Sequence, residues 1–199
     1  MSDADWMAQQ LHDHLEVVGA SKSLIAEARV VGELLCERFA SRGILYTIGN
    51  GGSAADAQHL TGELIGHYRH DRRPLPAVTL TTDATVSTCI ANDYEFDSVF
   101  SRQVEALAHE GDIVVAFTTS GRSLNVIRAL EAAKANGATT VLFAGGDGGP
   151  ALALADHALI VPSRETPRIQ EVHTLLLHII SKLVDDWAEA LQHGNGAAL

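Results

Sequence analysis

Two side chains that can move protons or bind a metal ion, His59 and Glu63, stand four positions apart in a stretch with helical spacing. Residues at i and i+4 share one face of an α-helix, so the imidazole and the carboxylate point the same way. Such a pair suits joint metal ligation, paired acid and base catalysis, or an exposed salt bridge. Spacing alone leaves all three interpretations open, because the pattern is common by chance.

A glycine-rich corner comes directly before this pair. The apolar run Ile44 to Ile48 is followed by the segment Gly49-Asn50-Gly51-Gly52-Ser53. A β-branched and aromatic run that ends in glycines and passes into a helix is typical of a parallel strand in an α/β fold. Glycines let the backbone approach a ligand, and the free N–H groups of the first helical turn favour an anion. The corner is therefore a predicted anion-binding element.

A second corner follows the apolar run over residues 113–117. Its loop, Thr118-Thr119-Ser120-Gly121-Arg122-Ser123, carries four hydroxyl groups and opens a helix that we expect over residues 123–136. Hydroxyl and N–H groups at a helix N-terminus can bind phosphate oxygens, although such residues also serve as ordinary N-caps. Both corners follow strands, at the edge where α/β sheets bind their ligands.

Polar groups also interrupt the apolar pattern of a long C-terminal helical stretch, predicted over about residues 166–191. They are Gln170, His173 and His178, and their grouping on one helix raises the chance of a functional site. The apolar face of this stretch, with that of the N-terminal helices, exceeds what a small sheet must cover. We therefore expect part of it to form a subunit interface.

Two further segments give weaker signals. Asn92-Asp93 follows a helical stretch at residues 84–91 and is by itself typical of a turn. The glycine-rich loop over residues 145–150 could bind an anion, but its composition favours a simple turn of the chain.

The elements that must position these groups alternate between helix and strand. Runs such as 113–117 are apolar on both faces, as expected for a parallel sheet with helices on both sides. Helical spacing over residues 5–41 predicts two helices broken near Gly19. The five predicted strands cover residues 44–48, 77–81, 113–117, 140–144 and 158–161. We expect one α/β domain over residues 1–199, with an N-terminal helical segment at 1–42, a core at 43–192 and a frayed tail at 193–199.

Composition excludes several classes of protein. A chain of 199 residues with 46% hydrophobic content can bury the core of one domain. A net charge of -11 argues against binding nucleic acid or an anionic membrane, and any phosphate must be held by local N–H and hydroxyl groups rather than by a basic field. Without a signal peptide or an apolar run of about 20 residues, we expect a cytoplasmic protein. Cys36 and Cys89 lie in apolar segments, which predicts two buried thiols.

Several motifs together resemble the phosphoheptose isomerases, or sedoheptulose 7-phosphate isomerases, of the sugar isomerase (SIS) domain family. The motifs are GNGGSAADAQH, ELIGHYR, IANDYEFDSVF, TTSGRS and RIQEVHTLLLH, and the resemblance runs from about residue 40 to residue 185. It implies a single SIS domain with a five-stranded parallel sheet, and a homotetramer with sites at subunit interfaces. It also implies an isomerase that interconverts D-sedoheptulose 7-phosphate and D-glycero-D-manno-heptose 7-phosphate through an enediol, early in the synthesis of activated heptose.

The resemblance implies roles for individual residues. Glu63 would be the base that moves a proton between two carbons, and His178 would transfer protons at the oxygens. A zinc ion is implied at His59, Glu63, Gln170 and His178. The implied substrate-binding residues are Asn50, Gly51, Gly52, Glu63, Asn92, Asp93, Thr118, Thr119, Ser120, Ser123 and Gln170, with Ser53 beside them as a further contact.

Two other functions remain open at this point. One is a noncatalytic SIS regulator that binds a replication initiator protein, and the other is a SIS isomerase for a different sugar phosphate. The presence of both Glu63 and His178 favours an enzyme over the regulator. The chain also departs from the pattern of its relatives, with His67 where many have arginine and Arg122 where asparagine or lysine is common.

Overall fold

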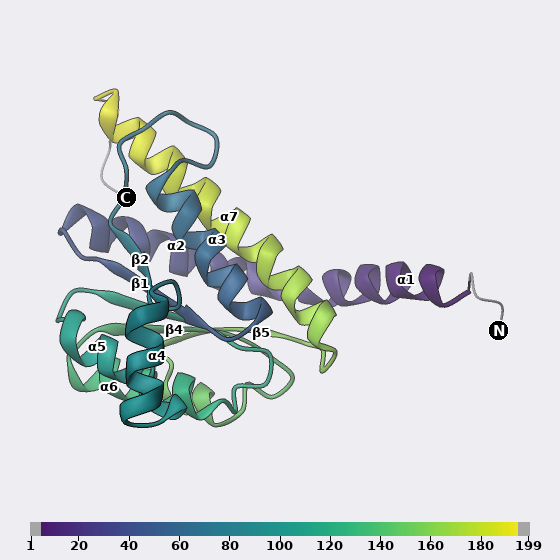
Figure 1. Cartoon of the computed structure of the whole chain (residues 1–199). Coiled ribbons are helices and arrows are strands. Elements are labelled where there is room, and N and C mark those ends of the chain that lie inside the picture. Colours follow the sequence, from purple (N-terminus) through teal and green to yellow (C-terminus); the bar gives the residue numbers. More distant parts are fainter. Residues whose placement is uncertain (1–4, 195–199) are drawn as a thin grey trace.

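A five-stranded parallel sheet lies at the centre of the chain (Figure 1). The computed structural model describes residues 5–194. The strands are β1 (Leu45–Gly49), β2 (Ala77–Thr79), β3 (Ile113–Phe117), β4 (Thr139–Gly145) and β5 (His157–Val161), in the order β2-β1-β3-β4-β5. Gly49 at the end of β1 pairs with Phe117 at the end of β3, so the loops that follow these two strands leave the sheet side by side.

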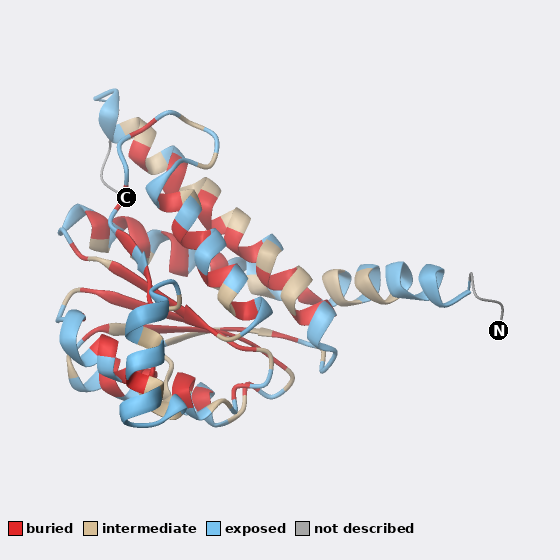
Figure 2. Cartoon of the chain, in the orientation of Figure 1, coloured by how far each residue is buried: buried red, intermediate tan, exposed pale blue. Residues whose placement is uncertain are grey.

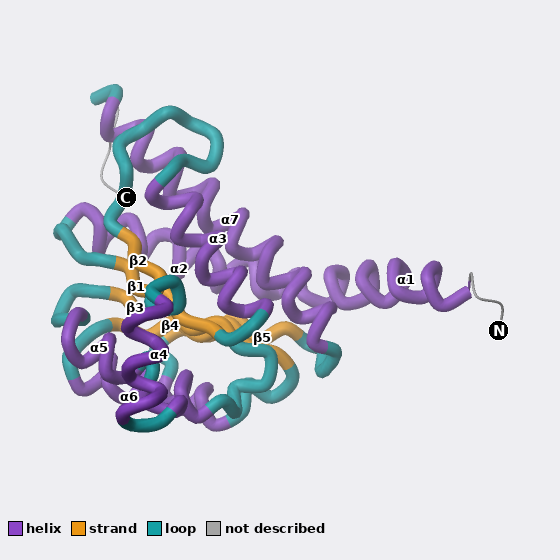
Figure 3. The backbone as a smooth tube through the Cα atoms, viewed as in Figure 1, coloured by secondary structure: helices purple, strands orange, loops and turns teal. Residues whose placement is uncertain are grey.

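Helices cover both faces of this sheet (Figure 3). They are α1 (Asp5–Ala20), α2 (Leu24–Ala40), α3 (Gly52–Ile65), α4 (Ala84–Asp93), α5 (Ser101–Leu107), α6 (Leu124–Ala135) and α7 (Thr166–Gln192). Helices α2, α3 and α7 bury one core against the sheet, and α4, α5 and α6 bury the other. The predicted α/β domain with five parallel strands, N-terminal helices and a long C-terminal helix is confirmed.

The strands are apolar on both faces because each face meets a separate core. Val115 and Phe117 of β3 point into the core under α2, α3 and α7, whereas Val114 and Ala116 point into the core under α6. Successive side chains of a strand point to opposite faces, so a strand between two helical layers needs apolar residues at every position.

Helix α1 projects away from the rest of the chain (Figure 1). A short 3-10 turn, Ser21–Ser23, separates it from α2, which agrees with the break predicted near Gly19. Within the described range none of the α1 residues is buried (Figure 2). Its contact with the rest of the chain is polar in part, because Arg168 of α7 donates to the carbonyl of Gln10 at 2.6 Å.

Two local predictions need correction. Asn92 and Asp93 form the last turn of α4 instead of following the helix. Cys36 is buried as expected, but Cys89 is exposed, because α4 turns only Ile90 fully into the core. Of the tail predicted over residues 193–199, residues 195–199 lie outside the described part of the chain. No helix within the described range is long and apolar enough to cross a membrane.

Candidate active site

Three side chains converge between α3 and α7, and we call them the His-Glu-His cluster. Nε2 of His59 lies 3.1 Å from Oε1 of Glu63 and 3.2 Å from Nε2 of His178. Their candidate ligand atoms all lie within 4.8 Å of one another. Helix α7 packs along α3, which brings His178 to a pair that is more than 110 positions earlier in the chain (Figure 1).

The cluster could hold a metal ion. With metal-to-nitrogen distances of about 2.0–2.1 Å, tetrahedral ligands stand roughly 3.3 Å apart, close to the 3.1 and 3.2 Å that separate His59 from Glu63 and His178. The cluster can equally act without a metal, because an imidazole beside a carboxylate forms an acid and base pair.

His178 favours its neutral form. Burial and then the neighbouring His59 lower the pKa of His178, and the carboxylate of Glu63 opposes this shift. A neutral imidazole at pH 7 can accept a proton on one nitrogen and donate from the other. The ring of Tyr68 stacks on His178 with 5.6 Å between ring centroids.

The two corners predicted to bind anions line one cavity of about 240 Å³, which we call the hydroxyl cavity. Gln170 of α7 lines it, and a Cβ at position 52 would overlap the amide nitrogen of Gln170, so a larger residue there would displace this side chain. The corner is tied to α6 by reciprocal 2.9 Å hydrogen bonds between the amides of Asn50 and Asn125. The lining residues are Asn50, Gly52, Ser53, Phe117, Thr118, Thr119, Ser120, Ser123, Thr166 and Gln170.

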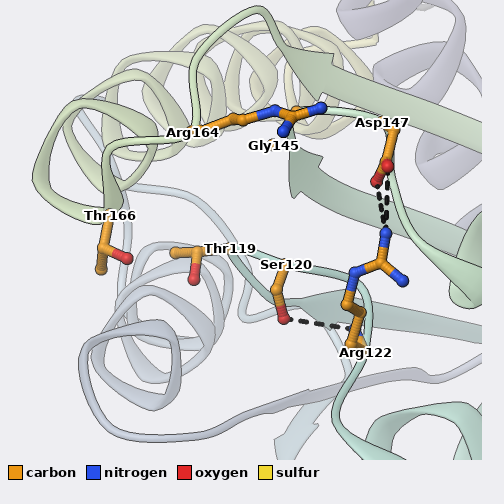
Figure 4. A pocket seen from close by; sticks show the side chains of 8 residues that line it. Thr119, Ser120, Arg122, Gly145, Asp147, Arg164 and Thr166 are labelled. Carbon is orange, nitrogen blue, oxygen red and sulfur yellow. Dashed lines mark hydrogen bonds and ion pairs between the residues drawn. The ribbon is translucent and has the colours of Figure 1, made fainter.

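A second cavity of about 230 Å³, the arginine cavity, adjoins the first (Figure 4). Figure 4 shows the guanidinium groups of Arg122 and Arg164 directed toward Asp147. Arg122 donates to both carboxylate oxygens of Asp147, at 3.0 and 3.2 Å. The pKa of Asp147 lies below its ordinary value, first because the N–H of Gly149 donates to it and then because of Arg122. The arginine cavity is lined by Thr119, Ser120, Arg122, Gly145, Gly146, Asp147, Arg164 and Thr166.

This cavity adds two arginines to the hydroxyl and N–H groups that the sequence predicted for anion binding. Ser120 lines both cavities, so two guanidinium groups lie beside the hydroxyl loop despite the net charge of -11. Arg122 was visible in the motif. Arg164 was missed because it comes from the segment between β5 and α7, and only the fold brings it to Arg122.

The glycine loop over residues 145–150 supports the hydroxyl loop. It does turn the chain, as predicted, with Gly146, Gly148 and Gly149 at positive φ. In addition, Gly145 donates its N–H to the carbonyl of Thr119 at 3.1 Å, so the loop holds the backbone of the hydroxyl loop in place.

His173 lies apart from the cluster, and its grouping with Gln170 and His178 was wrong. It is fully buried, with its ring edge against Phe117 and Phe143 and its Nε2 3.3 Å from the carbonyl of Ala144. Burial lowers its pKa to about 4. Five positions on a helix amount to a rotation of about 500°, which turns His173 and His178 to different faces.

Other predicted site residues occupy separate places. Asn92 and Asp93 are exposed at the end of α4 and are not among the described residues that line either cavity. Gln170 stands eight positions before His178, about 12 Å along α7, and lines the hydroxyl cavity. Its place as a metal ligand therefore stays a prediction.

Asp56 was missed by sequence reasoning. It is buried one turn before His59, and Thr174 of α7 donates to its Oδ1 at 3.1 Å. Its Oδ2 has no partner among residues 5–194, and burial raises its pKa. The spacing of three residues from His59 was the available signal, because it indicates a shared helix face.

A sequence model of the SIS domain family matches residues 9–145, more than half of the chain. The phosphoheptose isomerase of Trichlorobacter lovleyi is 45% identical over 192 residues, which cover 96% of this chain and 98% of that protein. The chain belongs to the phosphoheptose isomerases of the SIS domain family, and it is an isomerase.

Solved structures agree with this assignment. The phosphoheptose isomerase of Neisseria gonorrhoeae has a TM-score of 0.88 at 38% identity, over 93% of this chain and 100% of that one. The phosphoheptose isomerase of Francisella tularensis has a TM-score of 0.88 at 31% identity, over 94% of this chain and 100% of that one. The predicted family and the prediction of an enzyme are confirmed.

Proposed function

We propose that this enzyme interconverts D-sedoheptulose 7-phosphate and D-glycero-D-manno-heptose 7-phosphate, early in the synthesis of activated heptose. The observation that carries the proposal is the meeting of His59, Glu63 and His178 between α3 and α7, with a hydroxyl-lined cavity nearer the N-terminal end of α7. The names of the relatives support the class of substrate. The noncatalytic regulator and an isomerase for another sugar phosphate are less well supported.

The proposed reaction needs two proton transfers. Glu63, with a side chain 19% exposed, takes a proton from the carbon next to the carbonyl and returns it to the neighbouring carbon. His178, held neutral, moves a proton between the two oxygens of the enediol. An open route to the cluster is needed for substrate entry, and the partial exposure of Glu63 is consistent with it.

The phosphate is assigned to the other end of the site. The hydroxyls of Thr118, Thr119, Ser120 and Ser123 and the N–H groups at the start of α6 would hold it. Gln170 and His178 are separated by about 12 Å along α7. This separation suits a seven-carbon chain whose phosphate and reacting carbons lie at opposite ends.

Further substrate contacts are assigned to the glycine corner and to Gln170. Asn50, Gly51, Gly52 and Ser53 would contact the sugar hydroxyls through side chains and backbone N–H groups. Asn92 and Asp93 remain proposed substrate contacts as well. These two residues would reach the substrate in an oligomer in which α4 of one subunit packs against the site of another.

A zinc ion is proposed at the His-Glu-His cluster, held by His59, Glu63 and His178. Gln170, the fourth ligand that the resemblance implies, lies about 12 Å along α7 from His178, so another subunit would have to supply it. Two imidazole nitrogens and a carboxylate oxygen are a donor set that zinc prefers, and the two separations from His59 suit it. When bound, the ion would polarise the substrate carbonyl. The carboxylate of Glu63 would then be a weaker base, because a cation stabilises its charged form.

Product identification tests the function directly. The purified chain is incubated with D-sedoheptulose 7-phosphate, and the sugar phosphates formed are identified by NMR. We expect D-glycero-D-manno-heptose 7-phosphate. Ketose phosphates of five and six carbons are assayed in parallel, and faster conversion of either would contradict the proposed substrate.

A further inference from the structure

A fully buried ion pair joins the loop after α3 to α7, near the proposed active site. Nε of Arg72 donates to Oδ1 of Asp185 at 2.9 Å, and both side chains are 0% exposed. Burying two charges is unfavourable unless their remaining hydrogen bonds are satisfied. The other contacts of this pair therefore indicate what it holds in place.

Asp185 accepts hydrogen bonds from the loop that follows α3. Its carboxylate accepts N–H groups from Tyr68, Arg69 and His70, at 3.3, 2.9 and 2.8 Å. Burial would raise the pKa of Asp185, but these three donors and Arg72 outweigh it, so the pKa lies below its ordinary value. The carboxylate is thus charged at neutral pH and fixes the backbone of the loop to α7.

The loop in turn places an aromatic ring on the catalytic imidazole. Tyr68 stacks on His178 with 30° between the ring planes, and the guanidinium carbon of Arg69 lies 5.2 Å from the Tyr68 ring centroid. His178 and Asp185 are seven positions apart, about two turns along one face of α7. One face of α7 therefore carries both His178 and Asp185, and Asp185 holds the loop whose Tyr68 ring stacks on His178.

Arg72 contacts the other proposed catalytic residue, Glu63, at the backbone carbonyl of Glu63. The guanidinium donates to the carbonyls of Glu63 and Leu64, both at 2.8 Å. These carbonyls belong to the last turn of α3, where carbonyl groups have no partner within the helix. Arg72 caps the helix at the residue whose side chain must face the substrate.

We propose that Arg72, Asp185 and Tyr68 are positioning residues for the isomerase reaction. The ion pair sets the position of α3 relative to α7, holding Glu63 by its carbonyl and His178 through the Tyr68 ring. This inference rests on the proposed function, because it takes Glu63 and His178 as the groups that move protons.

The test compares Asp185→Asn and Tyr68→Ala with Tyr68→Phe and Asp186→Asn. Asp186 is the next residue and forms exposed pairs with Lys182 and with His70 of the loop, so Asp186→Asn makes the same chemical change while it keeps every contact of the buried ion pair. Circular dichroism and thermal melting give the folded fraction, and kcat and KM are then measured with sedoheptulose 7-phosphate per folded molecule. Tyr68→Ala keeps the inference testable if Asp185→Asn does not fold.

We expect Asp185→Asn and Tyr68→Ala to lower kcat about 10- to 100-fold, with KM within about threefold, because displacing catalytic groups slows the chemical step. Tyr68→Phe keeps the ring and should retain kcat within about threefold, as should Asp186→Asn. A kcat of Tyr68→Ala close to that of Asp186→Asn would overturn the inference, as would losses that only follow the unfolded fraction.

Glu63→Gln is included to separate two failures. If Glu63→Gln is inactive while Tyr68→Ala and Asp185→Asn are normal, the positioning inference fails and the proposed function stands. If Glu63→Gln is itself active, the proposed base is wrong and the positioning inference fails with it.

Discussion

At the scale of single residues, the proposed site divides into a group assigned to proton transfer and a group assigned to binding the phosphate. His59, Glu63 and His178 form the first, with His59 within hydrogen-bonding distance of both Glu63 and His178. The hydroxyl loop and the two arginines beside it form the second. Each group has a test of its own, because metal binding reports on the first and substrate affinity on the second.

Zinc content tests the cluster as a metal site. We expect roughly one zinc per subunit in protein purified without chelator or histidine tag, measured by elemental analysis. His59→Ala should lose it, because it removes one of three converging ligands. His109→Ala, at an exposed histidine on the other side of the sheet, is the matched control. If the purified protein contains no zinc and its activity survives a chelator, the proposed zinc site is wrong.

Arg164→Met tests the charge beside the phosphate end. We expect KM to rise about 3- to 10-fold with kcat nearly unchanged, because the phosphate is held equally in the ground state and the transition state. Arg164→Lys keeps the charge and should lie closer to wild type. The difference should shrink at high salt, since exposed charges are screened. An unchanged KM in Arg164→Met would show that this arginine does not contribute to phosphate binding.

At the scale of elements, α7 connects every part of the site. It carries Gln170 at the hydroxyl cavity, His178 in the cluster and Asp185 in the buried pair, while His173 and its apolar neighbours pack on the sheet. A shift of this helix would move the proton-transfer group relative to the phosphate end. The buried face of α7 therefore matters for function as well as for stability.

His173 gives α7 a dependence on pH that can be measured. Its pKa falls from 6.5 to about 4 in the folded chain, so folding favours the neutral ring. The stability it contributes is complete above pH 6.5 and is lost as the pH falls toward 4, by about 3 kcal/mol.

His173→Leu should therefore lose less stability than wild type between pH 7 and pH 4.5. Urea unfolding at both pH values and at one protein concentration measures the difference. His109→Leu, at an exposed ring, should follow wild type. Equal pH dependence in wild type and His173→Leu would show that His173 titrates normally.

The sequence predicted elements better than contacts between them. Strand β3 matched its predicted range because residues 113–117 are apolar on both faces, and the glycine corners marked the ends of β1 and β3. Strand β2 is shorter than predicted, Ala77–Thr79 against 77–81, since it lies at the edge of the sheet.

The contacts that complete the site were not predictable in the same way. Nothing local places Arg164 beside Arg122 or the Tyr68 ring on His178, because packing across the sheet brings these distant segments together. His173 was misassigned for a related reason, since the apolar pattern alone did not show which of the α7 histidines faces the sheet.

At the scale of the whole molecule, α1 points to association between chains. Trp6, Met7, Leu11 and Leu15 are each more than half exposed on a helix that projects from the domain. An isolated helix of 16 residues is only marginally stable in water unless its apolar side is covered. The predicted homotetramer would cover it.

Leu11→Glu tests this association. It puts a charge on the exposed apolar side of α1, so light scattering should show a species smaller than the tetramer expected of wild type. Gln9→Lys puts a charge near the opposite side of the helix, where it can pair with Asp13, and should leave the assembly unchanged. A wild-type monomer, or a tetramer in both variants, would contradict a role for α1 in assembly.

The most direct test of the central claim follows solvent deuterium into the sugar phosphate during turnover in deuterium oxide. Wild type should introduce deuterium at the reacting carbons of sedoheptulose 7-phosphate and its product, detected by NMR, as should Glu105→Gln, which changes an exposed carboxylate on α5. Folded Glu63→Gln should exchange and turn over at least about 100-fold more slowly, the scale of a lost general base. Exchange and turnover by Glu63→Gln at the wild-type rate would contradict the account.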